Sequence, residues 1–124
     1  MNVVDSCGWL EYFANGDNAD FFAPLLTDTG NLAVPSLVVF EVSKRVALQR
    51  GEAAARQAME FMAQGVPLAL GAETAFAAAL YSAQHQLPLA DSIILISARE
   101  NDAILWTQDS ALKGHDGVMY QEKK

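Results

Sequence analysis

Residues 1–13, MNVVDSCGWLEYF, change from one apolar pattern to another at Asp5. Residues 2–4 have the pattern of a short buried strand, whereas residues 6–13 space their large side chains as a helix does. Asp5 therefore lies at the joint between a strand and a helix. The ordinary role of Asp at such a joint is to cap the helix, because its side-chain oxygen can accept a free N–H of the first turn. A further role for Asp5 depends on whether other acids reach comparable joints.

The same alternation of strand and helix continues along the chain. Apolar segments typical of strands recur, and helical patterns lie between them. The expected strands are 2–4, 32–34, 66–70, 103–107 and 118–120, and the expected helices are 6–13, 17–27, 37–49, 52–64, 72–86 and 89–100. Strands that alternate with helices favour a parallel sheet covered on both faces. We therefore predict one α/β domain, residues 1–124, built as a three-layer α/β/α sandwich around a mostly parallel sheet of about five strands.

Composition limits the class of protein. The chain has 124 residues, a net charge of −7 and a single cysteine, Cys7, which cannot form an internal disulfide. No run of about 18 apolar residues predicts a membrane span, and residues at the N-terminus lack the pattern of a signal peptide. We therefore expect a soluble, cytoplasmic protein. The negative charge opposes diffuse binding to nucleic acid, so such a partner would require local basic residues or metal ions.

Three further acids, Glu41, Asp91 and Asp109, occupy notable positions. Glu41 lies at the edge of the apolar stripe of its helix, where it could simply pair with Lys44 or Arg45. Asp109 follows the strand 103–107 and could cap a short helix. Asp91 shares the apolar face of its helix, and Pro88 suggests that this helix starts too early for Asp91 to cap it. A carboxylate buried without a partner is costly, and metal coordination is one remedy.

These four acids could share one pocket. In an open parallel sheet, the residues just beyond the carboxyl ends of strands line the ligand crevice at the topological switch point. Asp5 and Asp109 both follow strands, and helices could bring Glu41 and Asp91 to the same place. Oxygen ligands of this kind suit Mg²⁺ or Mn²⁺, not zinc. Such a cluster suits the hydrolysis of phosphodiesters, in which metal ions activate water and neutralise charge on the leaving oxygen.

Three long segments carry a resemblance to a known family. They are VVDSCGWLEYF (3–13), VPSLVVFEVSKR (34–45) and LPLADSIILISARENDAILWTQD (87–109). With the order of strands and helices around them, the chain resembles the PIN domain family and, within it, the VapC-type ribonuclease toxins of toxin–antitoxin pairs. The resemblance implies a metal-dependent endoribonuclease that acts on RNA with Mg²⁺ or Mn²⁺.

The same resemblance implies roles for individual residues. By this resemblance, the catalytic, metal-binding acids of the family correspond to Asp5, Glu41, Asp91 and Asp109. The supporting hydroxyls of the family correspond to Ser6 and Thr107. The resemblance also implies a homodimer and a short antitoxin whose tail covers the active site, often bringing an Arg to the acids.

The closing motif departs from the family pattern. The family usually has Thr, any residue, Asp, any residue, Asp and Phe, whereas residues 107–112 here read TQDSAL. Thr107 and Asp109 are therefore kept, but Ala111 and Leu112 replace the last acid and the Phe. This departure leaves open whether one metal or two would bind.

Other residues have weaker patterns. The densest basic stretch comprises Lys44, Arg45, Arg50 and Arg56. These residues could contact RNA phosphates, or they could form a solvated helix face. The aromatic residues near the N-terminus favour core or dimer contacts over base stacking, and we expect them to supply area for a homodimer: Trp9, Tyr12, Phe13, Phe21 and Phe22. His85 and His115 have no obvious partners and are assigned no catalytic role.

Alternative functions fit the pattern less well. A phosphoacceptor receiver domain needs a central Asp that VPLALGAET (66–74) lacks, and Asp5 has no adjacent acid. A haloacid-dehalogenase-type phosphatase needs a second Asp at the position of Cys7. The remaining alternative is a catalytically inactive PIN-like module that binds RNA or protein without cutting, but four retained acids favour the nuclease. No sequence feature indicates which RNA is cut.

Overall fold

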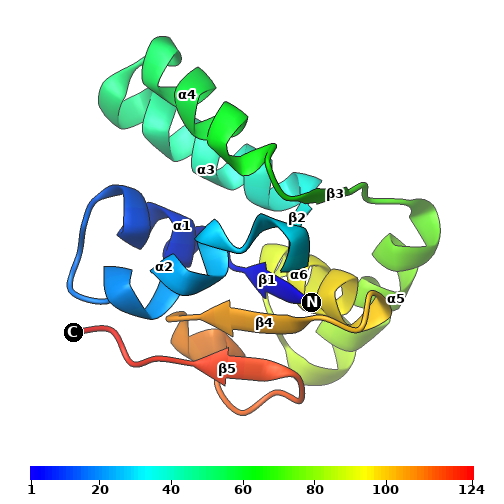
Figure 1. Cartoon of the computed structure of the whole chain (residues 1–124). Coiled ribbons are helices and arrows are strands. Elements are labelled where there is room, and N and C mark those ends of the chain that lie inside the picture. The colour runs from blue at the N-terminus through cyan, green and yellow to red at the C-terminus, as the bar shows by residue number, and fades with distance from the viewer.

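Five strands form a single parallel sheet at the centre of the fold (Figure 1). The computed structural model describes all residues from 1 to 124. The strands are β1 (Asn2–Val4), β2 (Leu32–Pro35), β3 (Val66–Leu68), β4 (Ile104–Thr107) and β5 (Val118–Tyr120). Their order is β3-β2-β1-β4-β5, and every neighbouring pair is parallel. The predicted α/β class with about five strands is confirmed, and the sheet is wholly parallel.

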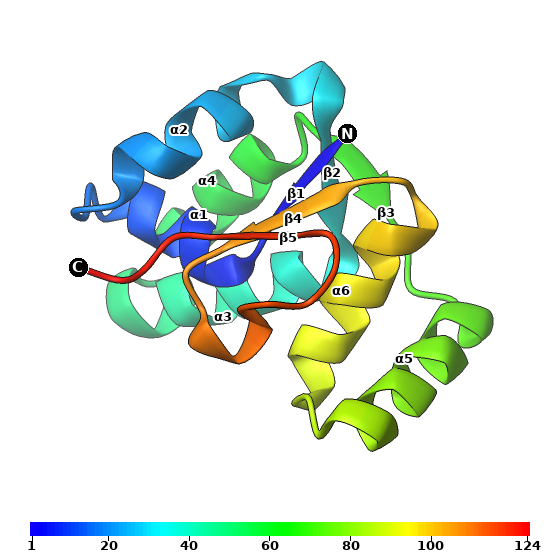
Figure 2. The same ribbon diagram turned by 90° about the horizontal axis from the view of Figure 1, so that it is seen from below.

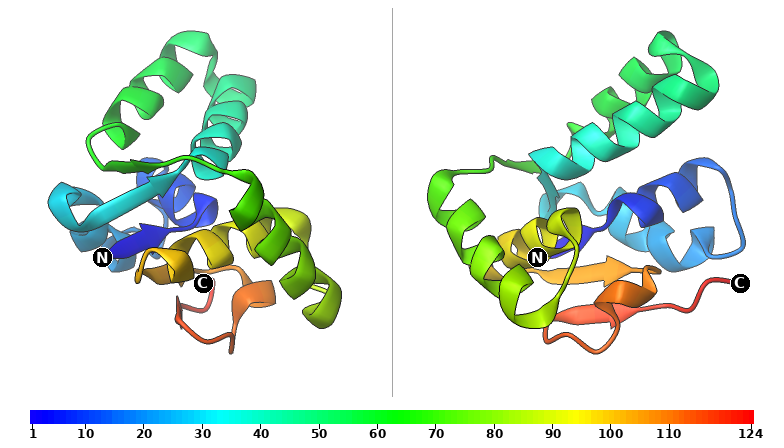
Figure 3. Two further views of the ribbon diagram at one scale, coloured as in Figure 1. Left: turned by 90° about the vertical axis from the view of Figure 1, so that its right-hand side faces the viewer. Right: turned by 180° about the vertical axis from the view of Figure 1, so that it is seen from behind.

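The chain also forms six α-helices, and two short 3₁₀ helices follow α2 and β4. They are α1 (Ser6–Phe13), α2 (Ala19–Thr27), η1 (Thr29–Asn31), α3 (Ser36–Arg50), α4 (Glu52–Met62), α5 (Ala72–His85), α6 (Leu89–Glu100) and η2 (Ser110–Leu112). Helix α2 packs against β1 on one face, whereas α6 packs against β2 and β4 on the other (Figures 2 and 3). Helices α3 and α4 form a hairpin that extends away from the sheet (Figure 1). None of these helices combines the length and apolar composition that a membrane span requires.

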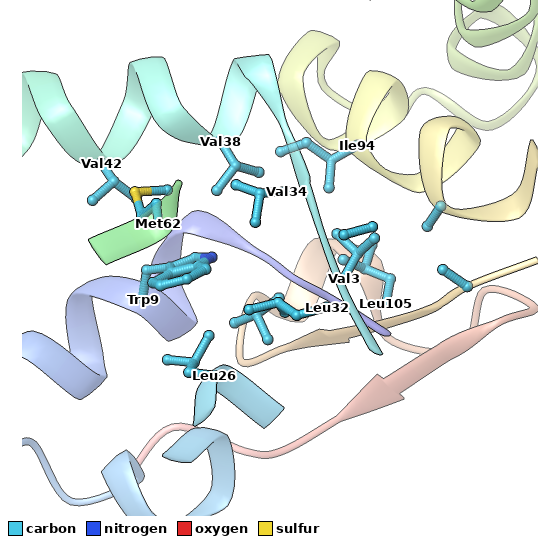
Figure 4. Packing of buried hydrophobic residues seen from close by; sticks show 14 of the residues in the cluster. Val3, Trp9, Leu26, Leu32, Val34, Val38, Val42, Met62, Ile94 and Leu105 are labelled. Carbon is cyan, nitrogen blue, oxygen red and sulfur yellow. The ribbon is translucent and has the colours of Figure 1, made fainter. Parts of the chain in front are cut away.

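One cluster of buried apolar side chains joins the sheet to its helices. Figure 4 shows Trp9 of α1 and Leu26 of α2 in this cluster, together with Val3 and Leu105 from the two central strands. Trp9 and Leu26 are 1% exposed, and both strand residues are fully buried. Burial on this scale is the main favourable term in folding, and it fixes α1 and α2 against the middle of the sheet.

The aromatic residues near the N-terminus belong to this core. Trp9 and Phe22 are buried, and Tyr12, Phe13 and Phe21 pack against the buried cluster. Our prediction that these residues supply dimer contacts is therefore wrong for Trp9 and Phe22. The reason is that α1 and α2 must turn their large side chains inward to cover the sheet.

The chain reverses its direction across the sheet between β1 and β4. It passes from β1 outward to β2 and β3, and then crosses to β4 and β5 on the other side of β1. The switch point of the sheet therefore lies between the two central strands, and ligand crevices form beyond the carboxyl ends of strands at such a point. Asp5 follows β1 there, and Gln108 and Asp109 follow β4.

Candidate metal centre

Asp5 uses its two carboxylate oxygens for different contacts. Oδ1 accepts the backbone N–H of Ser6 at 2.8 Å, so Asp5 caps α1. Oδ2 accepts the hydroxyl of Thr107 at 2.8 Å, and the Cys7 Sγ lies 3.5 Å from the same oxygen. Asp5 is only 3% exposed. Burial raises the pKa of Asp5 even though the hydrogen bonds from Thr107 and Ser6 lower it.

Thr107 connects Asp5 to Asp109. Its fully buried hydroxyl donates to Asp5 and accepts the backbone N–H of Asp109 at 2.9 Å. The carboxylate Oδ1 of Asp109 in turn accepts the backbone N–H of Ala111 at 3.0 Å and caps η2. The cap expected at Asp109 is therefore present. The Thr107 hydroxyl thus links the residues that follow β1 and β4.

Asp91 lies in the first turn of α6 but does not cap it. The helix begins at Leu89, directly after Pro88, and no side chain caps its first turn. Burial and then the negative charges of Asp109 and Asp5 raise the pKa of Asp91 to about 7. Asp91 is therefore a half-buried carboxyl group whose ionisation is opposed mainly by burial and by the acids around it.

Three of the four predicted acids converge. One carboxylate oxygen each from Asp5, Asp91 and Asp109 lies within 4.8 Å of the others. Asp5 follows β1 and Asp109 follows β4, and Asp91 comes from α6, which packs against β2 and β4. The three oxygens thus form a compact acid cluster at the switch point of the sheet.

Glu41 lies beside this cluster but outside the group of three. Burial, followed by the charges of Asp5 and Asp109, raises the pKa of Glu41, and a hydrogen bond with the Ser6 side chain partly offsets the rise. The Glu41 Oε1 atom is buried and has no hydrogen-bond partner. A buried carboxylate oxygen without a partner is energetically costly unless a cation or donor satisfies it. Ser6 thus acts on Glu41 through its side chain and on Asp5 through its backbone.

The donor set fits a hard divalent cation. Carboxylate oxygens are the ligands that Mg²⁺ and Mn²⁺ prefer, and the acid cluster supplies three of them. The unpartnered Oε1 of Glu41 provides a further oxygen close to these negative charges. A soft metal fits less well, because burial raises the pKa of the neighbouring Cys7 thiol to about 12 and keeps it protonated.

The altered closing motif leaves one acidic position without a carboxylate. Ala111 is exposed and offers no side-chain donor, whereas Leu112 is fully buried and belongs to the apolar cluster. Asp109 is the only acid that the motif contributes here.

Several of the basic residues line two hollows beside the acids. A cavity of about 660 Å³ is lined by Arg45 and Arg50, and a smaller one of about 410 Å³ by Lys44, Arg45 and Glu41. Arg56 is exposed on α4 and lines neither hollow.

Sequence reasoning missed a buried pair of carboxamides next to the acid cluster. The Asn18 Nδ2 donates to the Gln108 Oε1 at 2.9 Å and to the backbone oxygen of Glu122 at 3.0 Å. Asn18 is 2% exposed and Gln108 is 6% exposed. The pair joins residues 90 positions apart, so no local periodicity could indicate it.

The two histidines, expected to be isolated, in fact share a partner. The Tyr81 ring stacks on His85 at 4.1 Å between centroids, and the Tyr81 hydroxyl lies 2.5 Å from the His115 Nδ1. Arg99 also lies over the Tyr81 ring, 4.9 Å from its centroid. The expectation was wrong because these residues come from α5, α6 and the segment after η2, which only the fold brings together. None of them belongs to the acid cluster.

A wholly parallel sheet with acids gathered at its switch point defines an α/β domain with a candidate divalent-metal centre. A sequence profile of the PIN domain matches residues 3–118, and the chain belongs to the PIN domain family. No curated protein sequence matches the chain.

Solved structures with the same fold cover almost the whole chain. A toxin–antitoxin complex from Klebsiella pneumoniae has a TM-score of 0.82 at 19% identity and covers 99% of this chain and 100% of its own. The Sarcin-Ricin loop cleaving toxin VapC20 from Mycobacterium tuberculosis has a TM-score of 0.74 at 15% identity, with 95% and 98% covered. VapBC2 from Rickettsia felis, bound to a DNA fragment from its promoter, has a TM-score of 0.72 at 16% identity, with 98% and 97% covered.

Proposed function

We propose that this protein is a metal-dependent endoribonuclease and the toxin of a toxin–antitoxin pair. The observation that carries the proposal is the convergence of Asp5, Asp91 and Asp109 at the switch point, with their donor oxygens within 4.8 Å. Membership of the PIN domain family supports it. The similar structures support it as well, since one is described as a Sarcin-Ricin loop cleaving toxin and another as a toxin–antitoxin complex.

In this proposal each acid has a defined position. Asp5, Asp91 and Asp109 hold Mg²⁺ or Mn²⁺, and Glu41 contributes its unpartnered Oε1 beside them. The bound metal would activate water and neutralise charge on the leaving oxygen of the phosphodiester. Thr107 positions two of the ligands at once, because its hydroxyl contacts the side chain of Asp5 and the backbone of Asp109.

The remaining residues of the proposal act on the substrate and on partners. Lys44, Arg45 and Arg50 contact RNA phosphates from the two hollows beside the acids. Arg56 is a weaker candidate for this role because it lines neither hollow. The proposed protein partners are a cognate antitoxin and a second copy of the chain.

An RNA cleavage assay with and without divalent metal ions tests the proposal. Purified protein is incubated with structured cellular RNAs in Mg²⁺ or Mn²⁺ and then in excess chelator. We expect cleavage that needs the metal and that Asp91→Asn abolishes. Asp102→Asn is the matched control, because Asp102 is exposed and lies before β4, at the opposite end of that strand from Asp109. Its φ of +52° also suits Asn.

Two results would count against the proposal. Cleavage that persists undiminished in chelator would exclude the metal mechanism. Tight binding of RNA or a protein by an intact wild-type chain that cuts none of the RNAs would favour the inactive PIN-like binding module.

A further inference from the structure

The cavity of about 660 Å³ lies between α1, α3 and α4, and its lining includes two residues that neighbour acids of the cluster. One is Cys7, whose Sγ lies 3.5 Å from the Asp5 carboxylate. The other is Gln108, which stands between Thr107 and Asp109 in the chain. A group that occupies this cavity would therefore be separated from the Asp5 carboxylate by one side chain, that of Cys7. Its volume falls in the range of small-molecule sites.

The rim of the cavity is basic although the chain is acidic. The protein has eight Lys and Arg residues and a net charge of −7. Three of these eight, Arg45, Arg50 and Lys123, line this one cavity. The single acid in the lining, Glu11, is partly satisfied because its Oε2 accepts the backbone N–H of Asn18 at 2.8 Å. The rim therefore has the local positive charge that a phosphate backbone requires.

The interior of the cavity combines aromatic rings with one fixed carboxamide. Phe13 and Phe61 form part of its wall, with their rings edge to face and 5.7 Å apart. Gln108 is more than nine-tenths buried, and Asn18 holds its Oε1 at 2.9 Å. The Gln108 Nε2 takes part in no hydrogen bond within the chain, so it is free to donate to an occupant. Flat apolar surface beside a fixed amide is the chemistry that recognises the edge of an unstacked nucleobase.

We propose that this cavity binds a nucleobase of the RNA strand next to the phosphodiester held at the acids, and that Gln108 determines which base it takes. This inference rests on the proposed nuclease function and assigns a base-binding site to it. The basic rim carries the neighbouring phosphates, and Asn18 positions the Gln108 amide. An acidic peptide could also meet the rim, but a free amide donor that lines the same cavity as two aromatic rings matches one flat heterocycle with a polar edge.

The test measures nucleotide binding without metal and without cleavage. Metal-free protein in excess chelator is titrated with AMP, CMP, GMP and UMP, and with ribose 5-phosphate as the probe that lacks a base. Backbone amide shifts in the NMR spectrum report both affinity and location. We expect at least one nucleotide to bind about fivefold or more tightly than ribose 5-phosphate and to shift the amides of Cys7 and Gln108.

Four variants separate base recognition from phosphate contacts. Gln108→Ala removes the amide, and Gln108→Glu keeps its shape but replaces the donor by an acceptor, so both should lose the preference among the four nucleotides. Arg45→Ala should weaken the binding of all four nucleotides and of ribose 5-phosphate by the same factor. Gln64→Ala is the matched control, since Gln64 is exposed and does not line the cavity.

The outcomes distinguish this inference from the proposed function. Equal binding of all five probes, or a preference unchanged in both folded Gln108 variants, would overturn the base site. A base preference that depends on Gln108 supports the site even if wild-type protein cuts no RNA, which would count against the nuclease alone. Metal-dependent cleavage by a protein without any base preference would leave the nuclease and remove this inference.

Discussion

Asp5 shows how one residue can have both of the roles that its position suggests. Its Oδ1 caps α1 by accepting the Ser6 N–H, and its Oδ2 accepts the Thr107 hydroxyl. Asp5 also contributes an oxygen to the acid cluster with Asp91 and Asp109. The helix cap is confirmed. Metal binding by the same carboxylate stays a prediction, and substitution can separate the two roles.

Asp5→Asn should abolish metal-dependent RNA cleavage while the melting temperature of the metal-free protein does not fall. Asn caps a helix about as well as Asp, because its Oδ1 can accept the same N–H of Ser6. The substitution also removes a buried charge that lies among other acids. Cleavage assays and thermal unfolding in chelator measure the two effects.

Asp5→Ala is the contrasting variant, since it loses both the cap and the acceptor for Thr107. It should lower the free energy of unfolding by about 0.5–2 kcal/mol. Full cleavage activity in Asp5→Asn would limit Asp5 to capping. A large loss of stability in Asp5→Asn would show that its charge is needed for the fold itself.

The raised pKa of Asp91 predicts how the stability of the metal-free protein depends on pH. In the unfolded chain this carboxyl loses its proton near its ordinary value of 3.8, whereas in the folded protein its pKa is about 7. Between these values the folded state binds more protons than the unfolded state, so the free energy of unfolding decreases as pH rises. The raised pKa values of Asp5 and Glu41 act in the same direction.

Thermal unfolding of wild type and Asp91→Asn in chelator, over the range from about pH 4 to 8, measures this effect. The variant cannot ionise at this position, so its stability relative to wild type should increase steadily with pH. A difference between the two proteins that is independent of pH would contradict the raised pKa.

The sequence could predict which acids lie near the switch point but not their final geometry. Asp5 and Asp109 follow strands, and the carboxyl ends of neighbouring parallel strands lie at one edge of a sheet. Glu41 lies outside the group of three. Sequence reasoning could not predict this, because the position of α3 relative to the sheet depends on tertiary packing and not on a local pattern. The buried Asn18–Gln108 pair depends on a contact across 90 residues and could not be predicted.

At the scale of elements, the position of α1 against β1 places Asp5. Gly8 lies in the first turn of α1, and a Cβ atom there would lie 2.5 Å from the Val4 Cγ1 and 2.8 Å from the Phe22 ring. Only glycine allows this close approach of the helix to the strand and to α2. Although Gly disfavours helices, this contact explains its presence inside one.

Gly8→Ala should therefore destabilise the protein by about 1–3 kcal/mol, the cost typical of added volume in a packed core. Gly30→Ala is the matched control, because a Cβ at Gly30 meets no atom within 4 Å. Chemical denaturation of both variants provides the measurement. A Gly8→Ala variant as stable as wild type would show that α1 can move away from β1 without cost.

Most elements could be predicted because the residues that start and end them are adjacent to them in the sequence. Gly51 follows the end of α3, and Pro88 precedes the start of α6, as expected. The predicted helix 52–64 was too long, because α4 ends at Met62, before Gly65. The predicted strand 66–70 was too long: β3 ends at Leu68, and residues 69 and 70 are exposed. This strand lies at the edge of the sheet, where Pro67 is tolerated and apolar residues are a weaker guide to pairing.

At the scale of the whole molecule, the exposed apolar residues differ from those expected at a dimer contact. Large apolar side chains are exposed on α5, where Phe76 is 63% and Leu80 is 53% exposed, and at the start of α6, where Leu89 is 71% exposed. Sequence patterns could not separate these residues from the core, because both sets are apolar and helical. Whether an apolar residue is buried or exposed depends on which helix face packs against the rest of the fold.

The homodimer implied by the family resemblance stays a prediction, and the exposed residues of α5 indicate how to test it. Light scattering at tens of micromolar should find a dimer, and Leu80→Glu should shift the protein toward the monomer by placing a charge on the exposed apolar face. A wild-type protein that is monomeric at this concentration would contradict the prediction.

The central claim is that Asp5, Asp91 and Asp109 together hold a divalent metal ion, and calorimetric titration with Mn²⁺ near neutral pH tests it most directly. The wild-type protein should bind Mn²⁺, and Asp5→Asn, Asp91→Asn and Asp109→Asn should each bind it about tenfold more weakly or worse, since even residues outside the ligand sphere often cost 10- to 100-fold. Asp102→Asn should bind as the wild type does. A wild-type protein that binds no Mn²⁺, or cluster variants that bind it as tightly as Asp102→Asn, would contradict the claim.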